Sequence, residues 1–200
     1  MKLQEACDIL QSMIGEVIDV SEENPNNKGR YGHAVEKMLG LKLGSHHIDF
    51  EDGELKTAPF KGNKIKEDWK ICKKWNKQYI EEKLYNVLLV VYDYDTGIIL
   101  SATCLGNLLD HPIIRKQFDT DLDYILSQPD PDLVSQTETD VFVAKTNDKG
   151  NKKINQRACY IAGAPATYLF GLGYGKSMRK GKNFVKEMEE YEQTEKGSAA

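Results

Sequence analysis

Residues 49–56 read Asp-Phe-Glu-Asp-Gly-Glu-Leu-Lys, and this stretch decides which fold and which chemistry we expect of the chain. Apolar and polar residues alternate on both sides of Asp52-Gly53, a dipeptide that is typical of a tight hairpin turn. The pattern predicts a β-hairpin over residues 47–57. Glu54 and Lys56 are two residues apart on its second strand, so we expect their side chains to point to the same face.

The same hairpin would bring two carboxylates together, because Asp49 lies across the turn from Glu54. Converging carboxylates form a hard oxygen site of the kind that Mg²⁺ prefers, and the Leu55 carbonyl could complete it. Lys56 would then hold an attacking water in line with a phosphorus atom and offset the charge that develops on the phosphate oxygens. These groups are the minimum set for phosphodiester hydrolysis. The alternative is a solvated hairpin edge, since Glu-x-Lys triplets are common in Lys- and Glu-rich chains.

The whole chain has the composition of a globular protein, with 200 residues, 40% of them hydrophobic, and a formal charge of −4. It predicts a single α/β domain over residues 1–200, with an N-terminal helical arm over about 1–20 and a charged C-terminal helix and tail over about 183–200. No apolar run is long enough to cross a membrane, and early acidic residues argue against a signal peptide. The four cysteines stand far apart and form no Cys-x-x-Cys pair, which fits a reducing cytoplasm.

The charge is unevenly distributed along the chain. Residues 1–27 carry a net charge of −5 and residues 110–140 a net charge of −6, whereas residues 56–83 carry +5 and residues 145–182 carry +8. Affinity for a polyanion depends on the field of one face rather than on the total charge. The two basic blocks could therefore line a cleft for a phosphate backbone, and the alternative is that they are solvated faces of Lys-rich elements.

Periodicity predicts the remaining elements. Helices are expected over residues 1–18, from Tyr31 to Leu39, over residues 66–83, 113–126 and from Asn183 onward. Strands are expected over residues 85–94 and 98–104, joined by an Asp-Thr-Gly turn, and over residues 141–145 and 157–162. The mixture indicates a central sheet that is flanked by helices.

A longer pattern surrounds the Glu-x-Lys triplet. Residues 28–40 read Lys-Gly-x-x-Gly-x-x-x-Glu-x-x-x-Gly; Ser45 and Asp49 follow, and residues 54–59 read Glu-Leu-Lys-x-x-Pro. This order of motifs resembles the MutH family, which joins mismatch-repair nicking endonucleases to type II restriction endonucleases that cut GATC. The resemblance covers some 35 residues and is far more specific than the triplet alone.

The resemblance implies a restriction-endonuclease-like PD-(D/E)xK fold with a mixed central sheet. It implies that Asp49, Glu54 and Lys56 are catalytic, that Glu36 joins the metal cluster, and that Lys83 supports catalysis. The metal ligands would be Asp49, Glu54, the Leu55 carbonyl and Glu36, with Mg²⁺ as the cofactor and Mn²⁺ as a substitute. Ile48 stands where the family often has Pro, a position that supplies no ligand.

The resemblance thins toward the C-terminal half, where the family reads DNA bases and contacts phosphates. The residues that fall there, or that lie in the second basic block, are Lys145, Thr146, Asn147, Lys149, Asn151, Arg157, Tyr160, Lys176, Arg179 and Lys180. Ala162-Gly163 replaces a basic pair of the family, and the loop before Arg157 is shorter. These departures concern base specificity rather than the chemistry.

The sequence therefore predicts a Mg²⁺-dependent, sequence-specific endonuclease of restriction type that cuts double-stranded DNA to 5′-phosphate ends, with a GATC-like site as the family's expectation. The alternatives are a methyl-directed mismatch-repair nicking enzyme, a non-catalytic DNA-binding protein of the same fold, and a protein-interaction domain. The expected partners are double-stranded DNA and either a cognate DNA methyltransferase or repair proteins, with no membrane. Both a monomer and a homodimer are compatible with the sequence.

Overall fold

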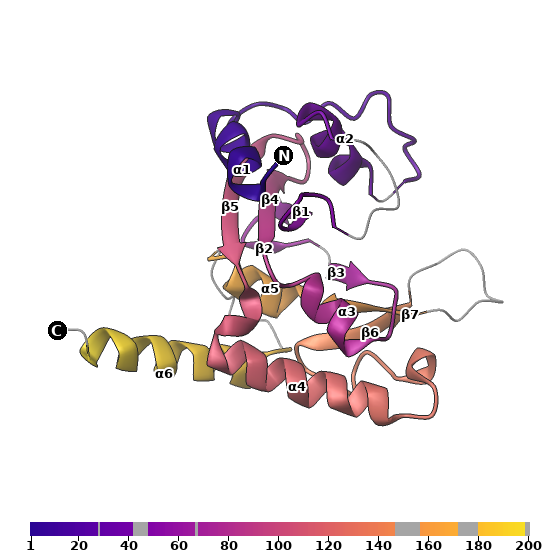
Figure 1. The fold of residues 1–200 in the computed structure, drawn as a ribbon, viewed down its shortest axis with the longest axis vertical. Helices are drawn as coiled ribbons and strands as arrows, with labels where there is room; N and C mark the ends of the chain where they lie inside the picture. Colours follow the sequence, from indigo (N-terminus) through magenta and orange to yellow (C-terminus); the bar gives the residue numbers. More distant parts are fainter. Residues whose placement is uncertain (28, 42–47, 67, 147–156, 172–179, 199–200) are drawn as a thin grey trace. The chain divides into compact units, whose positions relative to one another are not determined.

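The chain is a mixed α/β protein with a four-stranded mixed sheet and a three-stranded antiparallel sheet (Figure 1). The computed structural model describes residues 1–27, 29–41, 48–66, 68–146, 157–171 and 180–198. The chain divides into two compact units, one formed by Met1–Lys61 and Lys83–Leu108 and the other by Gly62–Glu82 and Leu109–Ala200. No described helix is long and apolar enough to cross a membrane.

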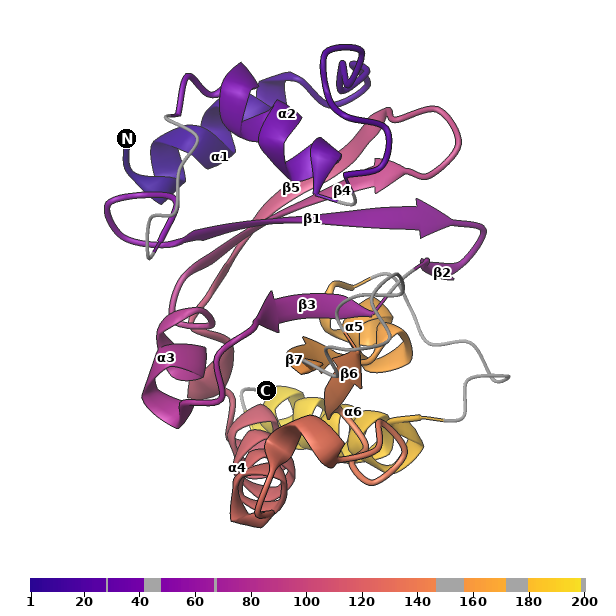
Figure 2. The ribbon, with the colours of Figure 1, turned by 90° about the vertical axis from the view of Figure 1, so that its right-hand side faces the viewer.

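The first unit consists of two helices and three long strands. These elements are α1 (Leu3–Ser12), α2 (Arg30–Met38), β1 (Glu54–Lys61), β4 (Val87–Asp93) and β5 (Ile99–Gly106). The four-stranded sheet has the order β2-β1-β4-β5, in which β1 and β4 are parallel and β4 and β5 are antiparallel. Figure 2 shows α1 and α2 on the same face of β1, β4 and β5.

Strand β4 is the centre of the first unit because its residues from Val87 to Tyr92 are all buried. A continuous apolar run of this kind is typical of a strand that is covered on both faces. The connection from β4 to β5 is a tight turn, in which the Asp93 carboxylate accepts the N–H groups of Asp95 and Thr96. Gly97 closes the turn at a φ of 74°, a conformation that favours glycine.

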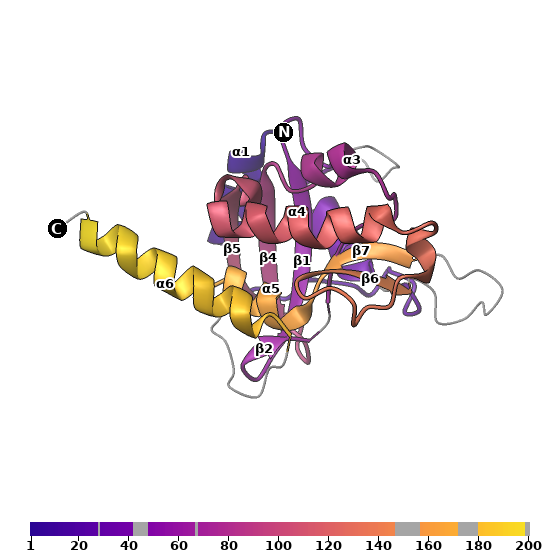
Figure 3. The same ribbon diagram turned by 90° about the horizontal axis from the view of Figure 1, so that it is seen from below.

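The second unit contains most of the remaining elements. They are β2 (Lys64–Ile65), β3 (Trp69–Cys72), α3 (Lys77–Glu82), the 3₁₀ turn η1 (Leu108–Asp110), α4 (Pro112–Ser127), the 3₁₀ turn η2 (Pro131–Leu133), β6 (Phe142–Thr146), β7 (Arg157–Ile161), α5 (Gly163–Leu169) and α6 (Lys182–Ser198). Strands β3, β7 and β6 form the three-stranded sheet in that order. Helix α6 contacts α4 and α5, and Figure 3 shows its C-terminal part extending beyond them.

Helix α4 organises the second unit through one apolar and one polar contact with β6. Phe118 packs edge-on against Phe142, with 5.1 Å between ring centroids. The buried Asp121 carboxylate accepts the N–H groups of Val141 and Phe142 at 3.0 and 2.9 Å, which fixes the start of β6. Since a buried carboxylate is costly unless it is hydrogen-bonded, these two donors explain why an acid is tolerated here.

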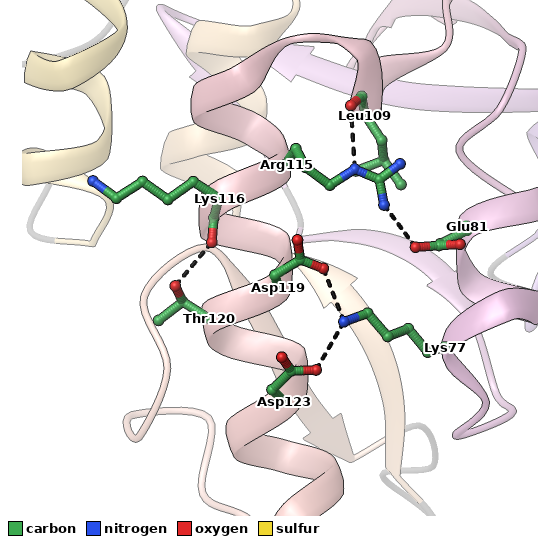
Figure 4. Close-up of polar contacts among 8 residues, drawn as sticks. All are labelled: Lys77, Glu81, Leu109, Arg115, Lys116, Asp119, Thr120 and Asp123. Atoms are coloured by element: carbon green, nitrogen blue, oxygen red, sulfur yellow. Dashed lines mark hydrogen bonds and ion pairs between the residues drawn. The ribbon is translucent and has the colours of Figure 1, made fainter.

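Ion pairs join α3 to α4 on the solvent side (Figure 4). Lys77 lies 2.8 Å from the carboxylates of both Asp119 and Asp123, and Arg115 lies 2.6 Å from Glu81. The two acids that share Lys77 are four residues apart, so they lie one turn apart on the same face of α4.

The structure confirms several sequence-based predictions of elements and corrects others. The helices at α2, α4 and α6, the β4–β5 pair and the β6–β7 pair are formed. The predicted hairpin over residues 47–57 is wrong, because Ile48–Phe50 is a bend and β1 pairs in parallel with β4. The predicted helix over 66–83 is wrong in its first half, where β3 pairs with β7.

One boundary and one helix also differ from the prediction. The first helix ends at Ser12 rather than at residue 18, because Val17 forms a β-bridge with Ile98. Helix α5 has no counterpart in the predicted elements. The prediction of one endonuclease domain stays a prediction.

Candidate active site

Parallel pairing of β1 with β4 brings the predicted catalytic residues of the first unit to one end of the sheet. Glu54 is the first residue of β1 and pairs with Val87, the first residue of β4. Lys83 precedes β4 by four residues. When two parallel strands start side by side, their first residues and the segments that lead into them lie at the same edge of the sheet. Glu54 and Lys83 therefore come together, although they are 29 positions apart in the sequence.

Glu54 is buried between two lysines. Its side chain is 5% exposed; Lys83 donates to Oε2 at 2.8 Å, and Lys56 donates to Oε1. Lys83 is itself buried and Lys56 is largely so. The contact with Lys56 confirms that the two side chains share a face of β1. A carboxylate removed from water needs such partners, because an unpaired buried charge is strongly destabilising.

Asp49 lies outside the strands but is held against β1 by the backbone. Its Oδ2 accepts the Leu55 N–H at 2.9 Å. Burial raises the pKa of Asp49, and the negative charge of Glu54 raises it further, whereas Lys56 and the Leu55 N–H act in the opposite direction. The negative charge of Glu54 therefore acts on the Asp49 carboxylate.

Glu36 approaches the same place from α2, which packs on β1. It is half-buried, and burial raises its pKa; the charge of Asp49 adds to this shift, and that of Glu54 makes a smaller contribution. His33 and Lys56 act in the opposite direction. Three acids from a helix, a bend and a strand thus share one electrostatic environment.

The side chains of this site offer the type of ligand atom that a hard divalent cation binds. Carboxylate oxygens are the ligands that Mg²⁺ prefers. A cation would also relieve the carboxylate repulsion that adds to burial in raising the pKa values of Glu36 and Asp49. Within the residues that the structure describes, no three His, Cys, Asp or Glu side chains are already gathered closely enough to hold a metal ion. Instead the two lysines engage both oxygens of Glu54.

Asn86 was not predicted from the sequence, although it contacts the backbone on both sides of Gly53. Its side-chain amide donates to the Asp52 carbonyl at 2.8 Å, and its own carbonyl accepts the Glu54 N–H at 2.9 Å. The only sequence signal is a polar residue immediately before a buried apolar strand. Such a signal does not identify a partner 34 residues away.

The predicted DNA-reading residues lie in the second unit, where three of the cations are engaged by the protein itself. Lys145 donates to Asp68 at 2.8 Å. The Arg157 guanidinium donates to the carbonyls of Asp132 and Ala144 at 2.8 and 3.3 Å.

Lys180 donates to the backbone carbonyls of Gln136 and Thr139, the latter at 3.0 Å. Burial lowers the pKa of this lysine. Tyr160 lies on β7 opposite Val143, with the Lys145 ammonium 5.8 Å from its ring centroid.

The other predicted DNA contacts are not placed. Thr146 is the last residue of β6 and pairs with Arg157, and its side chain is outside the description. Asn147, Lys149, Asn151, Lys176 and Arg179 lie outside the described residues.

Comparison with known proteins does not assign a function to the chain, so a functional proposal depends on the sequence motifs and on the geometry of the site. No protein-family model matches the chain, and no curated protein matches it.

Proposed function

We propose that the chain is a Mg²⁺-dependent endonuclease that hydrolyses double-stranded DNA, with a restriction-endonuclease-like core related to the MutH family. The observation that carries the proposal is the convergence of Asp49, Glu54, Lys56 and Lys83 at one end of the parallel β1–β4 pair. Asp49, Glu54 and Lys56 belong to the order of motifs that resembles that family, and Lys83 falls where the family has a lysine that supports catalysis. Glu36 from the same motif shares their electrostatic environment.

The carboxylates of Asp49, Glu54 and Glu36 and the carbonyl of Leu55 would hold the cation. Mg²⁺ bound there supplies positive charge that stabilises the phosphate oxygens as they become more negative. The Leu55 N–H orients Asp49 through Oδ2, and binding of the cation would draw the acids closer together, because no three of them are gathered around one point among the described residues. Burial of the site strengthens every charge interaction within it.

The lysines would act on the nucleophile and on the phosphate. Lys56, which is 17% exposed at its side chain, can exchange its contact with Glu54 for a water and hold that water in line with the phosphorus atom. The water oxygen forms a bond to phosphorus as the bond to O3′ breaks. The attacking water gives up a proton to solvent and O3′ takes one up from solvent, which leaves a 5′-phosphate and a 3′-hydroxyl. Lys83 is more deeply buried, so its role is to orient Glu54 and to support the phosphate charge.

A protein-interaction domain is the second candidate, and one observation favours it. Lys145, Arg157 and Lys180, which were predicted to contact DNA, are bonded within the protein. Binding that does not weaken with salt would support this candidate, because phosphate contacts release counterions and therefore depend on salt.

The test is incubation of the protein with unmethylated, hemimethylated and fully methylated duplexes, with and without Mg²⁺. We expect Mg²⁺-dependent cleavage of at least one duplex. Breaks in both strands of unmethylated DNA would indicate a restriction enzyme. Nicks confined to the unmethylated strand of the hemimethylated duplex, or to single strands of the unmethylated duplex, would indicate a methyl-directed nicking enzyme. No Mg²⁺-dependent break in any duplex would overturn the proposal.

A further inference from the structure

The turn that carries the candidate ligands is held by two elements that contribute no ligand. The turn itself is closed by a hydrogen bond from the Phe50 N–H to the Gly53 carbonyl at 2.9 Å. Asp49 precedes it and Glu54 follows it, so the conformation of residues 50–53 sets the separation of the two carboxylates. Whatever fixes this turn therefore also fixes the candidate site.

The first of these elements is helix α1. The residue before the helix, Lys2, makes no side-chain cap. Instead the Asp52 carboxylate accepts the Leu3 N–H at 2.8 Å, and the Glu51 N–H donates to the Met1 carbonyl at 3.3 Å. An acid that binds a free N–H at a helix N-terminus is stabilised both by the hydrogen bond and by the helix dipole. Asp52 therefore ties the turn to α1.

The second element is the segment from Lys83 to Asn86, which leads into β4. Asn86 donates from its side chain to the Asp52 carbonyl and accepts the Glu54 N–H at its own carbonyl. Three residues earlier, Lys83 bonds the Glu54 carboxylate. One short segment thus fixes the backbone of the turn and the side chain of a candidate ligand together.

Gly53 shows how closely these elements approach the turn. A Cβ atom at this position would lie 2.5 Å from the Asn86 carbonyl oxygen and would also overlap the Leu3 side chain. Leu3 is buried, so neither neighbour can move freely. The glycine is required by space, and the turn is packed between α1 and the start of β4.

We propose that Asn86 and Asp52 are positioning residues, which hold the turn so that Asp49 and Glu54 stay in register for a shared divalent cation. This inference rests on the proposed function for its catalytic consequence, but its structural part can be tested without cleavage. Residues that orient ligands without binding the metal typically change metal affinity or activity about 10- to 100-fold when they are replaced.

The test is Asn86→Ala, with Asn24→Ala as the matched control. Asn24 is an exposed residue of the same unit whose side chain also makes one hydrogen bond to a backbone group, the Asn26 N–H. In Asn86→Ala we expect Mn²⁺, followed by its paramagnetic resonance, to bind about 10-fold more weakly and kcat for Mg²⁺-dependent cleavage to fall by a similar factor. The KM for duplex DNA should stay within about twofold, because phosphate contacts are untouched.

A readout that needs neither metal nor DNA is amide hydrogen exchange at Leu55, whose N–H is bonded to Asp49. It should be faster in Asn86→Ala than in the wild type and unchanged in Asn24→Ala. Asp52→Ala should give the same pattern if α1 acts through Asp52. Wild-type exchange and Mn²⁺ affinity in Asn86→Ala, or equal losses in Asn24→Ala, would overturn the inference.

The two proposals fail in different ways. Absence of cleavage by the wild-type protein would overturn the proposed function. The positioning of the turn would then still be supported by faster Leu55 exchange in Asn86→Ala and contradicted by its absence.

Discussion

At the scale of single residues, the Glu54 carboxylate is the most constrained group of the candidate site. It is buried, and each of its oxygens is bonded to a different lysine. The desolvation cost of such a group is recovered only while its partners are present, so loss of one partner leaves an uncompensated buried charge. The group therefore links stability to the proposed chemistry.

Lys83→Met tests this link. It removes the partner of Glu54 Oε2 while keeping an unbranched apolar side chain of similar length. We expect the free energy of unfolding, measured by urea denaturation, to fall by about 3 kcal/mol. Lys77→Met is the control, because Lys77 is a solvent-accessible partner of Asp119 and Asp123 and should cost at most about 1 kcal/mol. If both variants lost the same unfolding free energy, burial of Glu54 with its two lysines would not make their ion pairs more important for stability than exposed ones.

The sequence predicts some of these residues for a local reason and misses others for a non-local one. Glu54 and Lys56 share a face because they are two apart on a strand, which any strand assignment implies. The contacts that Lys83 and Asn86 make with the turn at residues 50–54 depend on β1 and β4 lying side by side. The resemblance to a known family pointed to Lys83, but nothing pointed to Asn86.

At the scale of elements, errors arise where a short segment satisfies two patterns. Asp52-Gly53 between alternating residues is typical of a hairpin, yet the strand that follows, β1, pairs with β4. In the sequence, β2, β3 and α3 lie between these two strands. Residues 69–72 carry apolar residues that fit a helix or a strand, and pairing with β7 decides for the strand. Long periodic segments such as α4 are predicted correctly because local and tertiary preferences agree.

Helix α4 offers a pH-dependent test at this scale. Its N-cap is His111, whose Nδ1 accepts the Ile113 N–H at 3.3 Å. Burial lowers the pKa of His111 below its ordinary value of 6.5, although the charge of Glu192 on α6 acts in the opposite direction. The folded state thus favours the neutral ring, so its contribution to stability is present above pH 6.5 and is lost as the pH falls below that value.

His111→Asn keeps a good cap without the titration. When the pH is lowered from 7.5 to 5.5, we expect the wild type to lose up to about 1 kcal/mol more unfolding free energy than His111→Asn, as measured by urea denaturation. A difference that does not change with pH would contradict the assignment of His111 as a neutral cap.

At the scale of the whole molecule, the formal charge of −4 conceals strongly basic and acidic segments. Part of the acidity belongs to the candidate site itself. Part of the basic charge is engaged inside the second unit, where Lys145 forms an ion pair with Asp68 and Lys180 donates to backbone carbonyls. The total charge therefore predicts little about binding to a polyanion.

Salt dependence measures how many phosphates the molecule contacts. If it binds duplex DNA as proposed, the logarithm of the binding constant should fall linearly with the logarithm of the salt concentration, with a slope of about −0.9 per phosphate contacted. Fluorescence anisotropy with Ca²⁺ in place of Mg²⁺ gives this slope. A slope near zero would contradict the proposed partner.

The central claim is that Lys56 acts on the reaction beside Asp49 and Glu54, and one comparison tests it most directly. Mg²⁺-dependent cleavage of a duplex is measured for the wild type, for Lys56→Ala and for Lys61→Ala. Lys61 is the last residue of the same strand, where it forms an exposed ion pair with Asp95. The account predicts that Lys56→Ala lowers kcat at least about 100-fold and that Lys61→Ala stays close to the wild type. Full activity in Lys56→Ala would contradict it.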